Sequence, residues 1–420
     1  MKPHSPWAWI PTLYFAQGLP YVAVMTISVI MYKRLGISNA ELAFYTGWLN
    51  LPWVIKPLWS PFIDLIKTKR WWITWMQLLI GAGLAGIAFT LPTDYFFQLT
   101  LAVFWLMAFS SATHDIAADG FYMLGLNTHE QALFVGIRST FYRIATIAGQ
   151  GLLIMLAGHL ESTTNNIPFA WSITFMVLAG LFLALWAWHK FILPRPDADK
   201  AACEVSASTL MQEFWATFAS FFRKKQAGIA ILFMLLYRLP EAQLAKMSIP
   251  FLIDPVGEGG LGLTTEQIGF VQGTVGIIGL TLGGILGGIA VSRHGLKRWL
   301  WPMVCAISIP DIVYVYLSYM QPASLALVNT CVFIEQFGYG FGFTAYMLYL
   351  IYFANGEHKT AHYAICTAFM ALGMMIPGMA AGWLQEVMGY QMFFIWIMVC
   401  TLATFGVTAL LKIDPQFGKK

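Results

Sequence analysis

Two carboxylates and an imidazole interrupt a long apolar run between about residues 95 and 124. Asp115 and Asp119 are four residues apart, so a helix over this run would place both carboxylates on one face. Tyr122 follows one turn further along that face, and His114 lies beside it. Ionisable groups inside a membrane are costly and often mark an ion or substrate path, where adjacent carboxylates favour proton binding. We therefore expect Asp115, with Asp119 as its neighbour, to take up protons. The alternative is a structural ion pair with a basic residue of a neighbouring helix.

The composition predicts a membrane protein with many spans. Hydrophobic residues make up 58% of the 420 residues, charged residues make up 10%, and the mean hydropathy is +0.67. Apolar segments of about twenty residues, which is the length that crosses a bilayer as a helix, recur along the chain. The first of them lacks a small-residue cleavage site, so we expect it to remain as a span. The five cysteines are widely spaced and mostly within spans, which predicts neither a disulfide framework nor a metal site, and no cofactor is expected.

The apolar segments predict an all-α polytopic protein with twelve transmembrane helices in two bundles of six. One long polar interruption divides the chain into a first bundle over 1–191, a cytoplasmic linker over 192–224 and a second bundle over 225–420. Within the linker, an amphipathic stretch over 210–222 is expected to lie along the membrane surface. The predicted spans cover 7–33, 39–65, 71–91, 95–124, 130–158, 168–191, 225–253, 265–292, 299–319, 323–352, 358–385 and 389–412.

The basic residues predict the orientation of these spans. Most of the 24 Lys and Arg residues fall in alternate loops, which the positive-inside rule assigns to the cytoplasm, whereas Lys33 and Arg34 fall in a loop on the other side. Both termini are therefore expected in the cytoplasm. The same rule accounts for the net charge of +4 without a nucleic-acid partner.

Polar residues at membrane depth occur in both halves, and they are the candidate substrate contacts. Charges of both signs within the spans favour a polar, anionic or zwitterionic substrate. A guanidinium binds a carboxylate or phosphate through two hydrogen bonds, so we expect Arg143 and Arg238, with Lys56, to contact substrate carboxylates. Arg138 or Arg143 could instead neutralise the two carboxylates of the fourth span. The candidate substrate-binding residues are Gln17, Tyr21, Lys56, Tyr122, Arg138, Tyr142, Arg143, Arg238, Gln243, Gln336 and Tyr339.

The seventh and ninth spans also contain charged residues. Arg238 and Glu241 are three residues apart around Pro240, and this pattern fits either an interrupted helix at a transport site or a salt bridge that stabilises a kink. For Asp311 in the ninth span, a place in the pathway and simple packing both stay open. The Gly-rich stretch over 273–288 is expected to pack closely against another helix and not to bind phosphate.

Two short loops at equivalent places in the halves carry related sequences. The loop over 288–298 is similar to the cytoplasmic signature of the major facilitator superfamily, with Ser292 where an Asp is usual. The loop after the second span keeps that Asp but not the glycines. Twelve spans in two sixes is also the layout of this superfamily. The resemblance implies a latch that sets the conformational equilibrium, and its residues would be Asp64, Arg70, Arg293, Gly295 and Arg298.

Five further segments resemble the AmpG-type muropeptide permeases, whose signature also covers the related acetyl-coenzyme A transporters. These segments are 15–20, 56–64, 111–119, 237–242 and 333–340. By position, the resemblance implies proton-coupling roles for Glu241 and Glu335 together with Asp115 and Asp119. The sequence departs from the family pattern at His114, where Gln is usual, and at Pro240, where Gly is usual.

The resemblance implies a bacterial inner-membrane importer of N-acetylglucosaminyl-anhydro-N-acetylmuramyl peptides that works by proton symport and alternating access. Its expected partners are this glycopeptide, protons and membrane lipid, and the protein is expected to be a monomer. No Gly-x-Ser-x-Gly, HExxH or Walker A motif occurs, so neither an enzyme nor an ATP-driven pump is predicted. The alternatives are transport of another solute (a sugar, a siderophore or acetyl-coenzyme A), transfer of a lipid-linked sugar, and sensing without transport.

Overall fold

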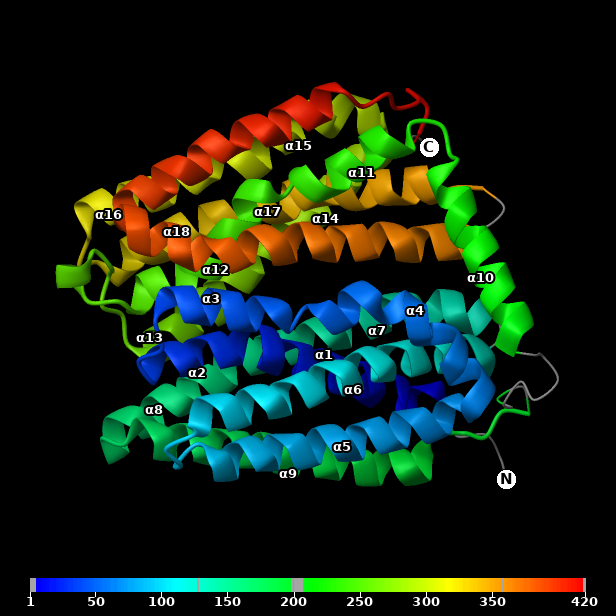
Figure 1. Cartoon of the computed structure of the whole chain (residues 1–420), viewed down its shortest axis with the longest axis horizontal. Helices are drawn as coiled ribbons and strands as arrows, with labels where there is room; N and C mark the ends of the chain where they lie inside the picture. Colours follow the sequence, from blue (N-terminus) through cyan, green and yellow to red (C-terminus); the bar gives the residue numbers. More distant parts are fainter. Residues whose placement is uncertain (1–4, 127, 198, 200–206, 357–358, 418–420) are drawn as a thin grey trace. The chain divides into compact units, whose positions relative to one another are not determined.

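The structure is a computed structural model that describes residues 5–126, 128–197, 199, 207–356 and 359–417. These residues form long helices joined by short turns, and the described part of the chain contains no strand (Figure 1). The predicted all-α class is confirmed. The reason is physical: a chain this apolar must satisfy its backbone hydrogen bonds within each spanning segment.

The chain divides into two compact units. Unit 1 comprises Met1–Leu35 and Ile55–Glu213, and unit 2 comprises Gly36–Val54 and Phe214–Lys420. The helices α4 (Leu51–Ile66) and α10 (Ala207–Phe222) each contain a boundary between the units. The helices of unit 1 are α1 (Ile10–Val22), α2 (Ser28–Arg34), α5 (Lys69–Thr90), α6 (Phe96–Gly125), α7 (Thr128–Ile147), α8 (Ile154–Thr164) and α9 (Ile167–Ile192). Those of unit 2 are α3 (Asn39–Trp48), α11 (Ala227–Leu236), α12 (Leu239–Ile253), α13 (Thr265–Phe270), α14 (Ile277–His294), α15 (Leu296–Ser308), α16 (Ile312–Met320), α17 (Leu325–Ala354) and α18 (Lys359–Ala409).

The described residues contain ten helical stretches that are long and apolar enough to cross a membrane. Two of the twelve predicted spans are not counted separately among them. The predicted second span is broken after Trp48 into α3 and α4. The predicted eleventh and twelfth spans are merged in α18, where Gly389 leaves the helical conformation with φ 72° and ψ 163°. Each of the twelve predicted spans therefore corresponds to helical structure. Ten separate stretches satisfy the length and composition expected of a membrane span.

In unit 1, α5 packs against both α6 and α9, and α1 packs against α6 and α7 (Figure 1). A buried aromatic and aliphatic cluster at one end of α1 and α6 includes Trp9, Leu13 and Phe121, each at most 1% exposed. These contacts hold α1, α6 and α7 in fixed rotation about their axes. The polar side chains of the three helices are positioned as a consequence.

In unit 2, glycines bring α14 and α17 into close contact. A Cβ atom added at Gly283 would overlap the carbonyl oxygen of Phe337, and one added at Gly340 would overlap that of Leu280. The prediction that the Gly-rich stretch is a packing surface is confirmed. In a membrane, where apolar helices gain little from leaving the lipid, such close backbone approach is a main source of helix association.

The helix α3 packs against α18 and α12 within unit 2, although it comes from the first part of the sequence. The approach is close, because a Cβ atom at Gly382 would overlap the carbonyl oxygen of Asn39. The Asn39 side chain donates to Asp254 Oδ2 (3.3 Å), Gln385 Oε1 (2.6 Å) and the Tyr390 hydroxyl (3.0 Å). This buried polar cluster ties the start of α3 to α18.

Several helices are locally irregular. Three short π-helical segments, η2 (Ala23–Ile27), η3 (Ala148–Leu153) and η5 (Val271–Gly276), continue α1, α7 and α13. The predicted seventh span is interrupted between α11 and α12, and Arg238 precedes the first residue of α12 with φ −105° and ψ 19°. No ion pair joins Arg238 to Glu241 within 4.0 Å, so of the two alternatives the interrupted helix is the one observed.

Candidate functional site

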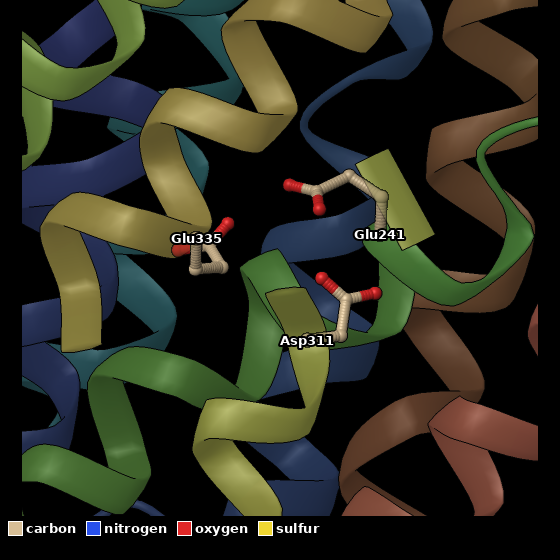
Figure 2. Close-up of side chains that lie close together, drawn as sticks. All are labelled: Glu241, Asp311 and Glu335. Atoms are coloured by element: carbon tan, nitrogen blue, oxygen red, sulfur yellow. The ribbon is translucent and has the colours of Figure 1, made fainter. Parts of the chain in front are cut away.

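Three buried carboxylates converge in unit 2: Glu241, Asp311 and Glu335, which we call the carboxylate triad. One carboxylate oxygen from each residue lies within 4.8 Å of the other two. The three residues are only 2–3% exposed. Figure 2 shows their side chains pointing toward one another from three separate elements.

Local structure explains how each acid reaches this place. Pro240 lies at the start of α12, where a missing backbone N–H costs nothing, and this puts Glu241 in the first turn. A carboxylate is favoured at that position by the helix dipole. Asp311 ends the short 3-10 segment η6 (Ile309–Asp311), which interrupts the predicted ninth span between α15 and α16. Glu335 lies within the long helix α17.

The triad has few partners for its negative charge. Glu335 accepts hydrogen bonds from Gln336 Nε2 at 3.1 and 3.2 Å. Glu241 Oε2 and Asp311 Oδ2 are buried without a hydrogen-bond partner. No described Lys or Arg lies within the 4.0 Å ion-pairing distance of any of the three acids. Three adjacent anions in such surroundings repel one another strongly, so the arrangement favours uptake of a positive charge.

Polar, uncharged side chains also lie near the triad. The Tyr314 hydroxyl lies near the side chains of Ser248 and Gln272. Ser308, one turn before Asp311, has a buried hydroxyl without a partner. Most of the polar atoms at the site are therefore oxygens. Oxygen atoms suit the binding of a proton or a small hard cation, and not of a metal that prefers thiolate ligands.

Arg238 lies one turn from the triad at the start of α12. Its side chain is 7% exposed, and its guanidinium carbon lies 5.3 Å from the ring centre of Tyr339 and 4.7 Å from that of Phe343. Its Nη2 donates a hydrogen bond to the Tyr339 hydroxyl, and its Nε is buried without a partner. The arrangement is a cation held over two aromatic rings.

Unit 1 contains a similar cluster around Arg138. The guanidinium carbon lies 5.1 Å from the ring centre of Tyr14 and 4.9 Å from that of Tyr122. Arg138 Nη1 contacts Asp119 Oδ1 at 3.4 Å and donates to the Tyr14 hydroxyl at 3.1 Å. The Tyr14 hydroxyl in turn donates to Asp119 at 3.1 Å. Here the guanidinium has both rings and a carboxylate.

The other predicted proton carrier, Asp115, is also paired. Lys56 Nζ lies 4.0 Å from Asp115 Oδ2, with the Lys56 side chain 32% exposed and that of Asp115 15% exposed. Asp115 and Asp119 lie on one face of α6 four residues apart, as the spacing predicts, but each has a basic partner. This arrangement is the structural ion pair that was the alternative to a proton site. The proton role of these two acids stays a prediction.

His114 does not face the two acids. Its Nε2 lies 3.0 Å from Gln77 Nε2, and the Gln77 amide oxygen lies 2.9 Å from His189 Nδ1. His189 Nε2 continues to the Thr12 hydroxyl at 2.9 Å. Gln77, His114 and His189 are at most 1% exposed. The chain of contacts joins α6, α5, α9 and α1 inside unit 1, so its immediate effect is to fix the rotation of α6.

The remaining predicted substrate contacts have varied surroundings. Gln243 is 3% exposed and accepts from Trp396 Nε1 at 3.0 Å while donating to Leu239 and Cys400. Gln336 donates to Glu335, as described above. Gln17 is buried with an unpartnered Oε1, Tyr21 is exposed, Tyr142 is half-buried and Arg143 is exposed.

The predicted latch residues fall into two groups. In unit 1, Arg70 donates to the carbonyl oxygens of Leu193 (3.2 Å) and Lys190 (2.5 Å), and the side chain of Asp64 lies outside the described residues. In unit 2, Gly295 joins α14 to α15 with φ 83°, and Arg293 and Arg298 are exposed. A latch role for these residues stays a prediction.

Sequence reasoning did not assign three residues that the structure places at these clusters. Asp311 was left open, although an acid beside Pro310 in an apolar span is a usable signal. Tyr14 and Phe343 are ordinary aromatic residues within apolar helices, so nothing in the sequence distinguishes them from packing residues.

Comparison with known proteins places this fold in a family. The sequence profile of the Major Facilitator Superfamily matches residues 12–360 of the chain, which is well over half of its length. The chain belongs to the Major Facilitator Superfamily. It is therefore a multi-pass membrane protein and a transporter of small molecules.

Individual relatives confirm the resemblance to AmpG-type permeases. An anhydromuropeptide permease of Escherichia coli is 26% identical over 396 residues, which cover 91% of this chain and 75% of the relative. The putative transporter AmpG 4 of Rickettsia conorii is 25% identical over 400 residues, which cover 93% of this chain and 92% of the relative.

Solved structures show the same fold at low sequence identity. A mutant of the nucleoside transporter NupG is similar with a TM-score of 0.73 at 16% identity, covering 96% of this chain and 99% of the other. A D-xylose-proton symporter is similar with a TM-score of 0.67 at 13% identity, covering 98% of both chains.

Proposed function

We propose that this Major Facilitator Superfamily transporter imports anhydro-muropeptides into the bacterial cytoplasm by proton symport. The observation that carries the proton part of the proposal is the carboxylate triad, whose three acids lie within 4.8 Å of one another without a basic partner among the described residues. The substrate part is supported by the Escherichia coli relative, whose name is anhydromuropeptide permease.

The triad is a better proton site than the pair of acids on α6. Asp115 and Asp119 already have Lys56 and Arg138 beside them, and a positive neighbour favours the ionised carboxylate. Glu241, Asp311 and Glu335 have no such neighbour in contact. Binding of a proton would relieve their repulsion, and release of the proton would restore it. The charge of this buried site would thus change once in each transport cycle.

The substrate of the proposed importer combines sugars with a peptide that ends in carboxylates. The chain offers matching chemistry: guanidinium groups at Arg138 and Arg238, and aromatic rings at Tyr122 and Tyr339 on which a sugar or peptide can pack. The location that follows is the bacterial inner membrane, with both termini in the cytoplasm, and we propose that a monomer works by alternating access.

Uptake into proteoliposomes tests this function. Labelled anhydro-muropeptide is offered outside, with the external solution more acidic than the interior or with no pH difference. We expect accumulation that requires the gradient and is abolished by a protonophore. Equal uptake with and without the pH gradient would contradict proton coupling but would still support this glycopeptide as the substrate. No uptake of this glycopeptide by correctly folded protein, together with uptake of a sugar, a siderophore or acetyl-coenzyme A, would contradict the substrate.

A further inference from the structure

A buried cation in unit 2 has no carboxylate within ion-pairing distance among the described residues. Arg238 is 7% exposed, and no described Asp or Glu lies within 4.0 Å of its guanidinium. The Tyr339 hydroxyl accepts from Nη2, but Nε has no partner. Buried charges in proteins are normally paired and fully hydrogen-bonded. The guanidinium of Arg238 therefore has room for a further hydrogen-bond acceptor.

Comparison with Arg138 in unit 1 shows what is missing. Both guanidinium groups lie over two aromatic rings at 4.7–5.3 Å, and both contact a tyrosine hydroxyl. Arg138 also has a carboxylate, Asp119, at 3.4 Å. Arg238 has no counterpart of that carboxylate among the described residues. Glu241 is the nearest acid along the chain, but its carboxylate belongs to the triad.

We propose that Arg238 is the subsite for a carboxylate of the transported molecule. The proposal rests on the proposed function and adds the chemical group that unit 2 recognises. A carboxylate would accept from Nε and from a remaining Nη hydrogen in the planar, two-bond geometry that guanidinium favours. The rings of Tyr339 and Phe343 hold the guanidinium plane in place. Both rings are only partly buried.

The experiment compares two forms of one substrate. Anhydro-muropeptide with free peptide carboxylates and the same compound with every carboxylate converted to an amide are bound to wild-type protein and to Arg238→Gln. We expect wild type to bind the free acid about ten- to a hundredfold more tightly, as for a charge-assisted pair of hydrogen bonds. Arg238→Gln should lose most of this preference. Arg223→Gln, which removes an exposed guanidinium from a turn outside the site, should keep the preference.

The ratio of the affinities for the acid and the amide decides whether the proposal holds. A loss of binding by itself does not. A variant Arg238→Gln that binds both forms more weakly but prefers the acid as strongly as wild type does would overturn the proposal, because the arginine would then act only on structure. If this variant does not fold, Arg238→Lys keeps the charge and removes the planar fork. We expect Arg238→Lys to show a reduced preference, and an unchanged one would contradict the subsite.

A second probe separates this proposal from the choice of substrate. If wild type binds neither glycopeptide, the substrate named in the proposed function is wrong. Acetyl-alanyl-alanine and its C-terminal amide are then compared by thermal stabilisation of the full-length protein. Stabilisation of wild type by the acid alone, absent in Arg238→Gln, would uphold a carboxylate subsite for another solute. Equal effects of acid and amide on wild type would overturn it.

Discussion

The acids of this protein differ in their partners as well as in their burial. Asp115 and Asp119 each have a basic side chain within 4.0 Å, whereas Glu241, Asp311 and Glu335 have one another. A paired carboxylate holds its charge, and a crowded set of carboxylates gains from losing it. At the scale of single residues, this contrast decides which acids we expect to respond to a proton gradient.

A test of that contrast is Asp311→Asn, which keeps the size of the side chain and removes its charge. Per coupled proton, a gradient of about one pH unit sustains about tenfold accumulation in wild type. We expect accumulation by Asp311→Asn to fall toward the external concentration, while exchange of labelled for unlabelled substrate continues. The measurement is uptake and counterflow in proteoliposomes. Asp94→Asn, at an exposed carboxylate, serves as the control. Full accumulation by Asp311→Asn would exclude this acid from proton coupling.

The buried contacts of Gln77 lead to a different prediction. Gln77→Leu would leave ring nitrogens of His114 and His189 without their partner, at a cost of about 1–3 kcal/mol for each unsatisfied group. We therefore expect a lower temperature of unfolding in detergent. Gln98→Leu, which changes an exposed amide at the start of α6, should have little effect. Equal stability of the two variants would mean that water replaces the lost contacts.

At the scale of elements, helix contacts depend on small residues at a few positions. The approach of α14 to α17 leaves no room for a Cβ atom at Gly283, whereas a Cβ atom at Gly288 on the same helix would meet nothing within 4 Å. We expect Gly283→Ala to destabilise the protein by about 1–3 kcal/mol, the usual cost of overpacking, and Gly288→Ala to be neutral or stabilising. Thermal unfolding of both variants measures the difference. Similar losses in both would show that helix propensity matters more than contact here.

The attachment of α3 to α18 depends on one side chain. Asn39 donates to three acceptors, and Tyr390 adds a bond to Asp254 at 2.5 Å. We expect Asn39→Ala to speed backbone hydrogen exchange over 36–48 by about tenfold to a hundredfold, because about 1 kcal/mol is lost for each of the three hydrogen bonds removed. Asn355→Ala, at an exposed side chain, is the matched control. Unchanged exchange over 36–48 would mean that backbone packing at Gly382 alone holds α3.

At the scale of the whole molecule, the distribution of basic residues predicts the orientation in the membrane. In protein whose native cysteines are replaced, we expect Thr93→Cys to react with an impermeant maleimide in intact cells, because its loop follows the third predicted span. Lys297→Cys, in the loop after the eighth, should react only after the cells are opened. The reverse pattern would place the termini outside and would contradict import into the cytoplasm as proposed.

Local sequence patterns were enough to predict the membrane class, the helical fold and the family. These follow from local properties: hydropathy over about twenty residues, glycine spacing along one helix, and short motifs that need no knowledge of distant contacts. The shared face of Asp115 and Asp119 is of the same kind, because the pitch of a single helix fixes it.

Which charged groups contact one another depends on the tertiary structure. Glu241, Asp311 and Glu335 come from three elements separated by long stretches of chain, and their contact depends on how α12, η6 and α17 are rotated and interrupted. Likewise, α6 presents two similar acids, but the packing of α4 and α7 gives one of them Lys56 and the other Arg138. Such pairings depend on side-chain packing between distant segments, which local sequence patterns do not encode. For this reason the residues were predictable as candidates, and their grouping into paired and unpaired acids was not.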